Sequence, residues 1–86
     1  MAVLFRWLDH SENYSICLDD AEFDSVAPAF DVLREKTGVY IDPYGYSRLS
    51  PDHAAIVLAN FKADTPLSEM LKTCISEDKW IFVEGD

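Results

Sequence analysis

Residues 1–8 and 14–18 can each be divided into two faces with the period of two that strands show. In each segment the residues on one face are mainly apolar: Val3, Phe5 and Trp7 in the first, and Tyr14, Ile16 and Leu18 in the second. Five polar residues, 9–13, join the two segments. Two alternating runs joined by a short polar connection predict a β-hairpin.

The apolar positions that follow recur with the period of a helix. They form one stripe: Val26, Ala27, Phe30 and Leu33. If Ser25 is the N-cap, Pro28 falls in the first turn, where the missing N–H of proline costs little. Gly38 is suited to end the helix. We predict a helix over residues 26–36, in a helical region that begins in the acidic segment 19–24.

Two short strands are predicted next, over residues 39–41 and 46–49. The Asp-Pro-Tyr-Gly sequence between them, residues 42–45, has the residues of a type I turn. The second of these strands is optional in the prediction, so the sheet has four or five strands.

Two more helices are predicted by Ser50-Pro51 and Thr65-Pro66, because each pair places a proline directly after an N-cap residue. The apolar stripes that follow are Ala54, Val57, Leu58 and Phe61 in one helix, and Leu67, Met70, Leu71, Cys74 and Ile75 in the other. Residues 76–78 are expected to end the second of these helices.

Residues 79–84 predict a final strand that is apolar on both faces, as central strands are. The first and last strands are the most hydrophobic, so we expect them to be neighbours at the centre of the sheet. The predicted order is β-β-α-β-(β)-α-α-β. It favours a single α+β domain, residues 1–86, with a mainly antiparallel sheet and three helices packed on one face.

The negative charge of the chain is concentrated in its first half. Between Trp7 and Leu33 there are seven acidic residues and neither lysine nor arginine, and the whole chain has a net charge of −9. With 49% hydrophobic and 13% aromatic residues, the chain is too apolar for a disordered acidic tail. The charge opposes direct binding to nucleic acid or to an anionic membrane, and it favours a basic protein partner.

No apolar run approaches the roughly 18 residues that span a membrane, and the opening segment, with Arg6 inside it, does not have the pattern of a signal peptide. Two cysteines are too few for a disulfide framework. Cys17 and Cys74 are interpreted as two free thiols in a reducing compartment or as a single bridge. We expect a cytoplasmic protein.

No motif indicates catalysis. Cys17 or Cys74 could pair with His10 or His53, but neither cysteine lies near a glycine-rich nucleophile turn. The histidines, cysteines and acids also lack the spacing of known metal sites. We expect no catalytic residue, no metal and no cofactor, and therefore no enzyme. His53, the third residue of its predicted helix, is expected to cap that helix or to face solvent.

The candidate partner-binding residues are acids of the first half and tyrosines of the central turn. Acids would accelerate encounter with a basic protein, and tyrosines would supply anchors that lose water on binding. The predicted residues are Asp9, Glu12, Asp19, Asp20, Glu22, Asp24, Tyr44 and Tyr46.

The stretch from Thr37 to Pro51, TGVYIDPYGYSRLSP, is similar to a segment of small bacterial immunity proteins, and the closing residues 80–86 resemble their last strand. About half of the chain is covered. The resemblance implies an antidote that binds and neutralises a cognate toxin, often a nuclease, and it transfers no catalytic residues. Three alternatives stay open: an acidic DNA mimic that inhibits a nucleic-acid enzyme, a small enzyme or ligand-binding domain, and a structural or regulatory subunit. A large exposed apolar patch and constitutive dimerisation would favour the third.

Overall fold

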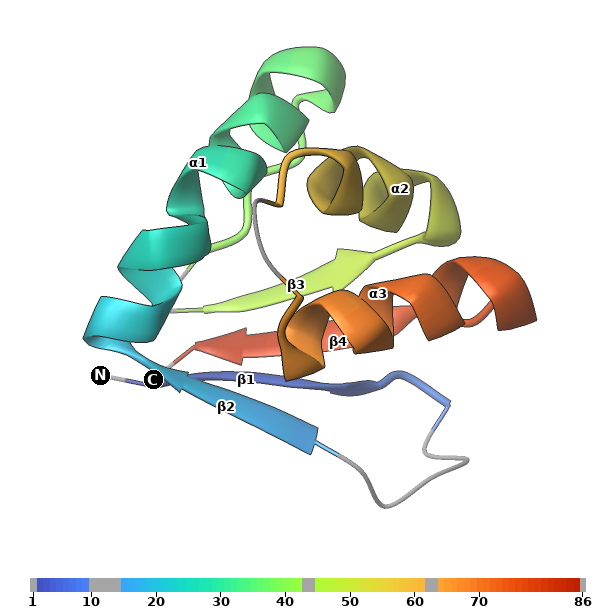
Figure 1. Cartoon of the computed structure of the whole chain (residues 1–86), viewed down its shortest axis with the longest axis horizontal. Helices are drawn as coiled ribbons and strands as arrows, with labels where there is room; N and C mark the ends of the chain where they lie inside the picture. The colour runs from blue at the N-terminus through green and yellow to red at the C-terminus, as the bar shows by residue number, and fades with distance from the viewer. Residues whose placement is uncertain (1, 10–14, 43–44, 62–63, 86) are drawn as a thin grey trace.

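The computed structural model describes residues 2–9, 15–42, 45–61 and 64–85. It contains seven elements, in the predicted order (Figure 1). They are β1 (Ala2–Trp7), β2 (Ser15–Asp19), α1 (Asp20–Thr37), β3 (Tyr46–Leu49), α2 (Pro51–Ala59), α3 (Pro66–Glu77) and β4 (Ile81–Gly85). The α+β class is thus confirmed, with four strands and three helices in the part of the chain that the structure describes.

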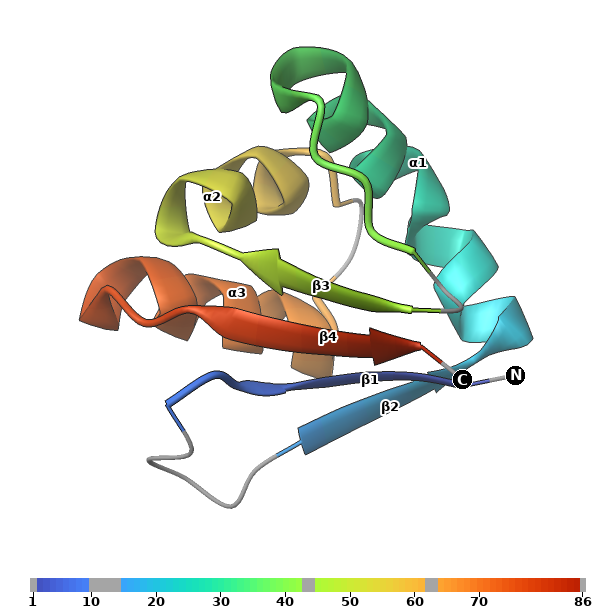
Figure 2. The same cartoon turned by 180° about the vertical axis from the view of Figure 1, so that it is seen from behind.

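The sheet has the strand order β2-β1-β4-β3, and each neighbouring pair is antiparallel. The prediction that the first and last strands lie side by side at the centre is confirmed. The predicted hairpin is confirmed in the pairing of β1 with β2, while residues 10–14 of its connection lie outside the described residues. Figures 1 and 2 show α1, α2 and α3 on the same face of the sheet.

The two faces of the sheet differ in burial because side chains alternate along each strand. Residues facing the helices are almost completely buried, as the predicted alternation requires; Val3, Phe5, Trp7, Ile81 and Val83 are at most 2% exposed. Their neighbours Leu4, Arg6 and Phe82 point to the other face and are partly exposed.

The core lies between the sheet and the helices. The Phe30 ring of α1 stacks on Phe5 of β1 at 6.1 Å and on Phe23 of its own helix at 5.8 Å, measured between ring centroids. Such aromatic contacts add roughly 0.5–1.5 kcal/mol each to the burial of the rings. α3 contributes its predicted apolar stripe: Leu67, Met70, Leu71 and Cys74 are buried, and Ile75 lies at the margin with 39% exposed.

The prediction that the helical region begins in residues 19–24 is confirmed, whereas the predicted start of the helix at Val26 was wrong. The helix begins at Asp20, not at Val26, because Asp19 and Glu22 form a capping box. The Glu22 N–H donates to Asp19 Oδ1 at 2.8 Å, and the Asp19 N–H donates to Glu22 Oε1 at 3.2 Å. Ser25 therefore lies inside the helix, where its hydroxyl donates to the Glu22 carbonyl at 2.7 Å.

Pro28 is consequently an interior helix residue and not part of the first turn, as was predicted. It removes one helical hydrogen bond, to the carbonyl of Asp24, which lies on the exposed face where water can replace it. Phe23 and Phe30, on either side of the proline, are both buried, so packing keeps the helix continuous. Gly38 ends α1 as predicted, in the left-handed conformation with φ 78°.

Residues 39–41 do not form the predicted strand; the strand in this region is β3. The Ser47 hydroxyl donates to the Tyr40 carbonyl at 3.4 Å and accepts the Asp42 N–H at 3.3 Å. A side chain thus meets backbone groups that a strand partner would otherwise satisfy. The predicted turn is centred on residues 43–44, which lie outside the described residues, but the Gly45 N–H reaches the Asp42 carbonyl at 3.3 Å.

The starts of α2 and α3 are confirmed. The His53 N–H donates to Ser50 Oγ at 3.2 Å, and the Ser50 N–H donates to His53 Nδ1 at 3.3 Å, so His53 has the capping role considered for it. Because α2 ends at Ala59, Phe61 of its predicted stripe lies beyond the helix and packs against the core from there. Asp78, with φ 54°, ends α3.

Candidate partner-binding surfaces

The structure brings together some of the predicted binding residues and separates others. Asp19, Asp20, Glu22 and Asp24 lie at the end of β2 and in the first turns of α1. Asp9 follows β1 at the opposite end of the sheet, since Ala2 at the start of β1 pairs with Asp19. The predicted residues Glu12 and Tyr44 lie outside the described residues, and Tyr46 belongs to β3.

Two of the four acids at the start of α1 have a structural role. The carboxylates of Asp19 and Glu22 accept backbone N–H groups in the capping box. Carboxylates near a helix N-terminus are also stabilised by the helix dipole. Their presence in the sequence is therefore explained by the helix itself, without a partner.

A longer acidic surface runs along the exposed side of α1. Asp20, Asp24, Asp31 and Glu35 are all exposed, and their spacing of four, seven and four residues places them on one side of a helix. We call these four residues the acidic face of α1. Asp31 and Glu35 were missed as candidates because a helix predicted to start at Val26 does not align them with Asp20 and Asp24.

Three residues of this face lack a cation. Among the described residues, Asp24, Asp31 and Glu35 form no ion pair, although Arg34 and Lys36 belong to the same helix. The Arg34 guanidinium lies over the Tyr40 ring instead, 4.9 Å from its centroid.

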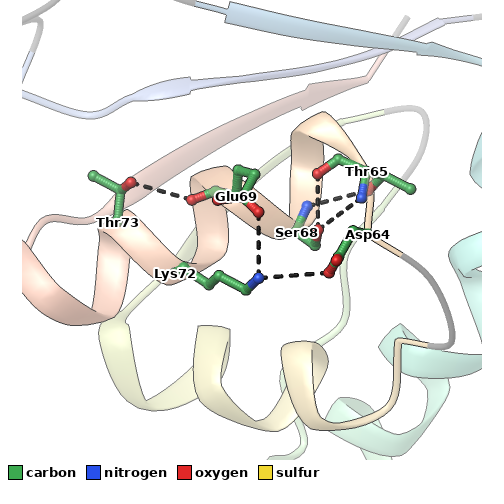
Figure 3. A network of polar contacts seen from close by, with 6 residues as sticks. All are labelled: Asp64, Thr65, Ser68, Glu69, Lys72 and Thr73. Carbon is green, nitrogen blue, oxygen red and sulfur yellow. Dashed lines mark hydrogen bonds and ion pairs between the residues drawn. The ribbon is translucent and has the colours of Figure 1, made fainter.

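Acids of α3 show the contrasting arrangement. Figure 3 shows Lys72 Nζ between Glu69 Oε1, at 3.2 Å, and Asp64 Oδ1, at 3.5 Å. The hydrogen bond with Glu69 and the charges of both acids raise the pKa of Lys72. The same network holds the start of α3, where the Thr65 N–H donates to Ser68 Oγ at 2.8 Å. The charges of Asp64, Glu69 and Lys72 are therefore matched locally, whereas Asp24, Asp31 and Glu35 on α1 have no ion pair among the described residues.

A second surface is the face of the sheet that α1, α2 and α3 leave uncovered (Figures 1 and 2). We call it the open face of the sheet and define it by seven side chains: Leu4, Arg6, Cys17, Tyr46, Arg48, Phe82 and Glu84. They come from all four strands. Cross-strand pairing places Arg6 and Arg48 on either side of Phe82, and places Leu4 and Tyr46 on either side of Glu84.

Aromatic and cationic groups are stacked on this open face. The Tyr46 and Phe82 rings are 5.7 Å apart between centroids, and the Arg6 guanidinium carbon is 4.9 Å from the Phe82 centroid. Tyr46 is 71% exposed. Neither Arg6 nor Arg48 has a carboxylate partner in the described part of the chain, and Arg6 Nε is buried without an acceptor. The sequence did not indicate this surface beyond the prediction of Tyr46.

A shallow apolar groove lies between α1 and the connection from α2 to α3. One part, about 230 Å³, is lined by residues that include Val26, Pro28 and Phe61, and an adjoining part, about 220 Å³, continues toward β2. Ser25 and Thr65 line both parts. Both hydroxyls are used within the chain, Ser25 as a donor to Glu22 and Thr65 as the acceptor of the Ser68 N–H.

The two cysteines are separate free thiols, so the single bridge is not formed. Cys17 is exposed on the open face, whereas Cys74 is buried and its Sγ donates to the Lys79 carbonyl at 2.8 Å. Burial, and to a lesser degree the Asp78 carboxylate, raise the pKa of Cys74 to about 11. The Cys74 thiol therefore stays protonated at neutral pH and has a structural role.

Across the described residues, no three histidine, cysteine or acidic side chains lie close enough together to hold a metal ion. Within the same ranges, no helix has the length and apolar character needed to cross a bilayer. Comparison with protein-family models, curated proteins and solved structures returned no match for this chain. The functional argument therefore depends on the acidic face of α1 and the open face of the sheet.

Proposed function

We propose that this chain is a binding protein that engages a basic protein through the acidic face of α1, and that this partner is a toxin which the chain neutralises. The observation that carries the proposal is the row of carboxylates along α1, three of which have no cation partner among the described residues. A helix that only needed a solvated surface could pair these acids with lysines at the neighbouring turn, as α3 does with Glu69 and Lys72.

The acidic face of α1 favours association with a basic protein partner. Like charges on one helix repel one another, and acidic pairs four residues apart cost a few tenths of a kcal/mol each. That cost is offset when a basic surface covers them. The field of an acidic face, in a chain of net charge −9, also accelerates the encounter with a cationic protein.

The resemblance of residues 37–51 and 80–86 to bacterial immunity proteins supports a toxin as the partner. In this proposal the acidic face of α1 lies across the basic cleft in which the toxin holds its substrate, and so blocks it. Tyr46 is on the far side of the sheet from the helices, so it does not belong to this surface.

The test measures binding to the protein encoded next to this chain in its genome, by calorimetry at about 50 mM and 300 mM salt. The variant Asp24→Lys, Asp31→Lys, Glu35→Lys is compared with the control Asp52→Lys, Asp64→Lys, Glu69→Lys. The control changes the net charge by the same amount, in α2, in the connection before α3 and in α3. The α1 variant should lose at least about a hundredfold in affinity, because close charge pairs in an interface contribute about 1.5 kcal/mol or more each.

Equal losses in the two variants would show that only net charge matters and would contradict the proposal. The DNA-mimic alternative predicts a different pattern: the chain would bind several unrelated basic proteins, and duplex DNA would compete with it on each. Protection of cells against one toxin, without such competition, supports the immunity function.

A further inference from the structure

We propose that the open face of the sheet is an interface between two copies of this chain, which dock face to face about a twofold axis. The acidic face of α1 lies in the helix layer, on the other side of the sheet, and stays exposed in both copies (Figure 1). This proposal does not depend on the identity of the partner that α1 binds.

The first argument is the uncovered aromatic surface. Tyr46 is 71% exposed and Trp80, which directly precedes β4, is 45% exposed. The Phe82 ring is stacked on Tyr46. Aromatic residues gathered on one side of a monomer mark a contact surface more strongly than scattered ones, since each ring gains from losing water.

The second argument is that the unpaired charges of the open face complement one another. Arg6, Arg48 and Glu84 share this face, yet none of them forms an ion pair within the ranges that the structure describes. A twofold interface brings each patch against a copy of itself, so a patch that carries both signs can satisfy its own charges. An arginine fork is well suited to accept such a carboxylate.

The strand register shows how the charges would meet. Glu84 and Phe82 occupy successive outward positions on β4, about 6.8 Å apart along the strand. A twofold axis that runs across the strands midway between these positions places Glu84 of each copy over Phe82 of the other. There the carboxylate lies between Arg6 and Arg48, whose strands are each about 4.8 Å from β4.

The expected dimer is weak. Four strands about five residues long present roughly 300 Å² in projection, well below the roughly 800 Å² per partner of a stable interface. The net charge of the chain is −9, but the seven side chains of the open face include two arginines and one carboxylate, so this face opposes the approach of a second copy less than an acidic surface would. We expect dissociation constants between about 10 µM and 1 mM, as weak contacts give.

Sedimentation equilibrium on the whole chain, from about 10 µM to 1 mM, tests the proposal. The single variants Glu84→Arg and Arg48→Glu should each weaken self-association at least about tenfold. Glu84→Arg places an arginine between Arg6 and Arg48, and Arg48→Glu replaces one of the two attractions of Glu84 by a repulsion while Arg6 remains. For Glu84→Arg, the proposed contact and the general repulsion between the chains predict opposite changes in self-association. This substitution lowers the net charge from −9 to −7, so general repulsion alone would make association stronger.

A mixture of the two single variants should recover part of the association that each variant loses. In the mixed dimer, Glu84 of the Arg48→Glu copy lies between Arg6 and Arg48, as in wild type, and the new arginine of the Glu84→Arg copy lies between Arg6 and the new glutamate. The balance of attraction is better than in either variant alone, so the mixture should associate more strongly than each variant does by itself. Asp31→Arg on α1 is the control with the same change in net charge, and it should not weaken the dimer. Circular dichroism confirms that each variant is folded.

A wild-type chain that is monomeric at about 1 mM would overturn the proposal and leave the open face to a different partner. A dimer that neither single variant weakens would overturn it as well. If both single variants dissociate and the mixture does not recover, the twofold arrangement with Glu84 between the arginines is wrong.

Discussion

The acidic face of α1 and the open face of the sheet are built in opposite ways. The first is a row of carboxylates with one sign of charge and no aromatic side chain, and the second combines stacked rings with two arginines and a glutamate. A single-sign surface attracts a partner from a distance, while an aromatic surface holds one after contact. In the two proposals made above, the two sides of this molecule therefore have separate tasks.

The two surfaces also differ in how far apart their residues lie in the sequence. The acidic face comes from one helix, so its residues span 20–35. The open face combines β1 and β4, which lie at opposite ends of the chain, with β2 and β3. A surface of the first kind is sensitive to changes in one helix, whereas the second depends on the register of the whole sheet.

The largest expected effect separates the two faces of the sheet. Phe5→Ala removes a completely buried ring that stacks on Phe30, and it should cost about 3–5 kcal/mol of the free energy of unfolding. Phe82→Ala, on the open face, should cost only about 1 kcal/mol, the value of its cross-strand contacts, while weakening self-association. Urea denaturation of both variants measures this difference, and equal losses would show that the open face is packed like the core.

The two thiols provide a second contrast. Because burial and the Asp78 carboxylate raise the pKa of Cys74 from 9.0 to about 11, the folded chain keeps this proton where the unfolded chain loses it. The contribution of the protonated Cys74 thiol to the free energy of unfolding is complete below about pH 9 and is lost as the pH rises toward 11. The free energy of unfolding should therefore fall over this range in wild type and in Cys17→Ala, but less in Cys74→Ala. An identical slope in all three would contradict the assignment.

A smaller effect distinguishes structural acids from exposed ones. Asp19→Ala removes the N-cap of α1 and should cost about 0.5–2 kcal/mol of stability. Asp31→Ala should change the free energy of unfolding by less than about 0.5 kcal/mol, as exposed substitutions do. It should nevertheless weaken partner binding more than Asp19→Ala does. Thermal unfolding and calorimetric binding together test the pair. A large loss of stability in Asp31→Ala would mean that Asp31 has an undetected structural contact.

The smallest effect concerns charge pairing on the helices. Glu35→Lys converts the repulsive pair that Asp31 and Glu35 form four residues apart into an attractive one, and should stabilise the fold by about 0.4–1 kcal/mol. Glu69→Lys should instead destabilise it by a few tenths, because Lys72 loses an exposed ion pair. If Glu35→Lys and Glu69→Lys change the free energy of unfolding in the same direction, the acids of α1 do not repel one another, and the contrast between α1 and α3 is wrong.

Much of the fold could be predicted because its signals are local. The N-cap and proline pairs identified α2 and α3, Gly38 identified the end of α1, and the period of two identified β1 as a strand and grouped Val3, Phe5 and Trp7 on one of its faces. The start of α1 was misplaced because two capping signals compete there. Ser25 before Pro28 looked like a start, but the reciprocal bonds of Asp19 and Glu22 are made six and three residues earlier.

The candidate surfaces were less predictable than the fold. The charge run indicated the start of α1 and missed Asp31 and Glu35, since the helical alignment of acids depends on where the helix begins. Asp9 was grouped with Asp19 by nearness in sequence, although the antiparallel hairpin puts them at opposite ends of the sheet. The row of Arg6, Phe82 and Arg48 joins three strands and has no signature in any one of them.

By itself the sequence determined the class of each element, the N-caps of α2 and α3, the end of α1, the period of two along β1 and the excess of acid in the first half. These properties depend on neighbours within a few residues, where backbone geometry is the same in any fold. Tertiary structure alone decided that β1 and β4 pair in this register, and so which outward side chains share a face. The reason is physical: cross-strand contacts join residues almost 80 positions apart, and a shift of one residue would exchange the two faces of a strand.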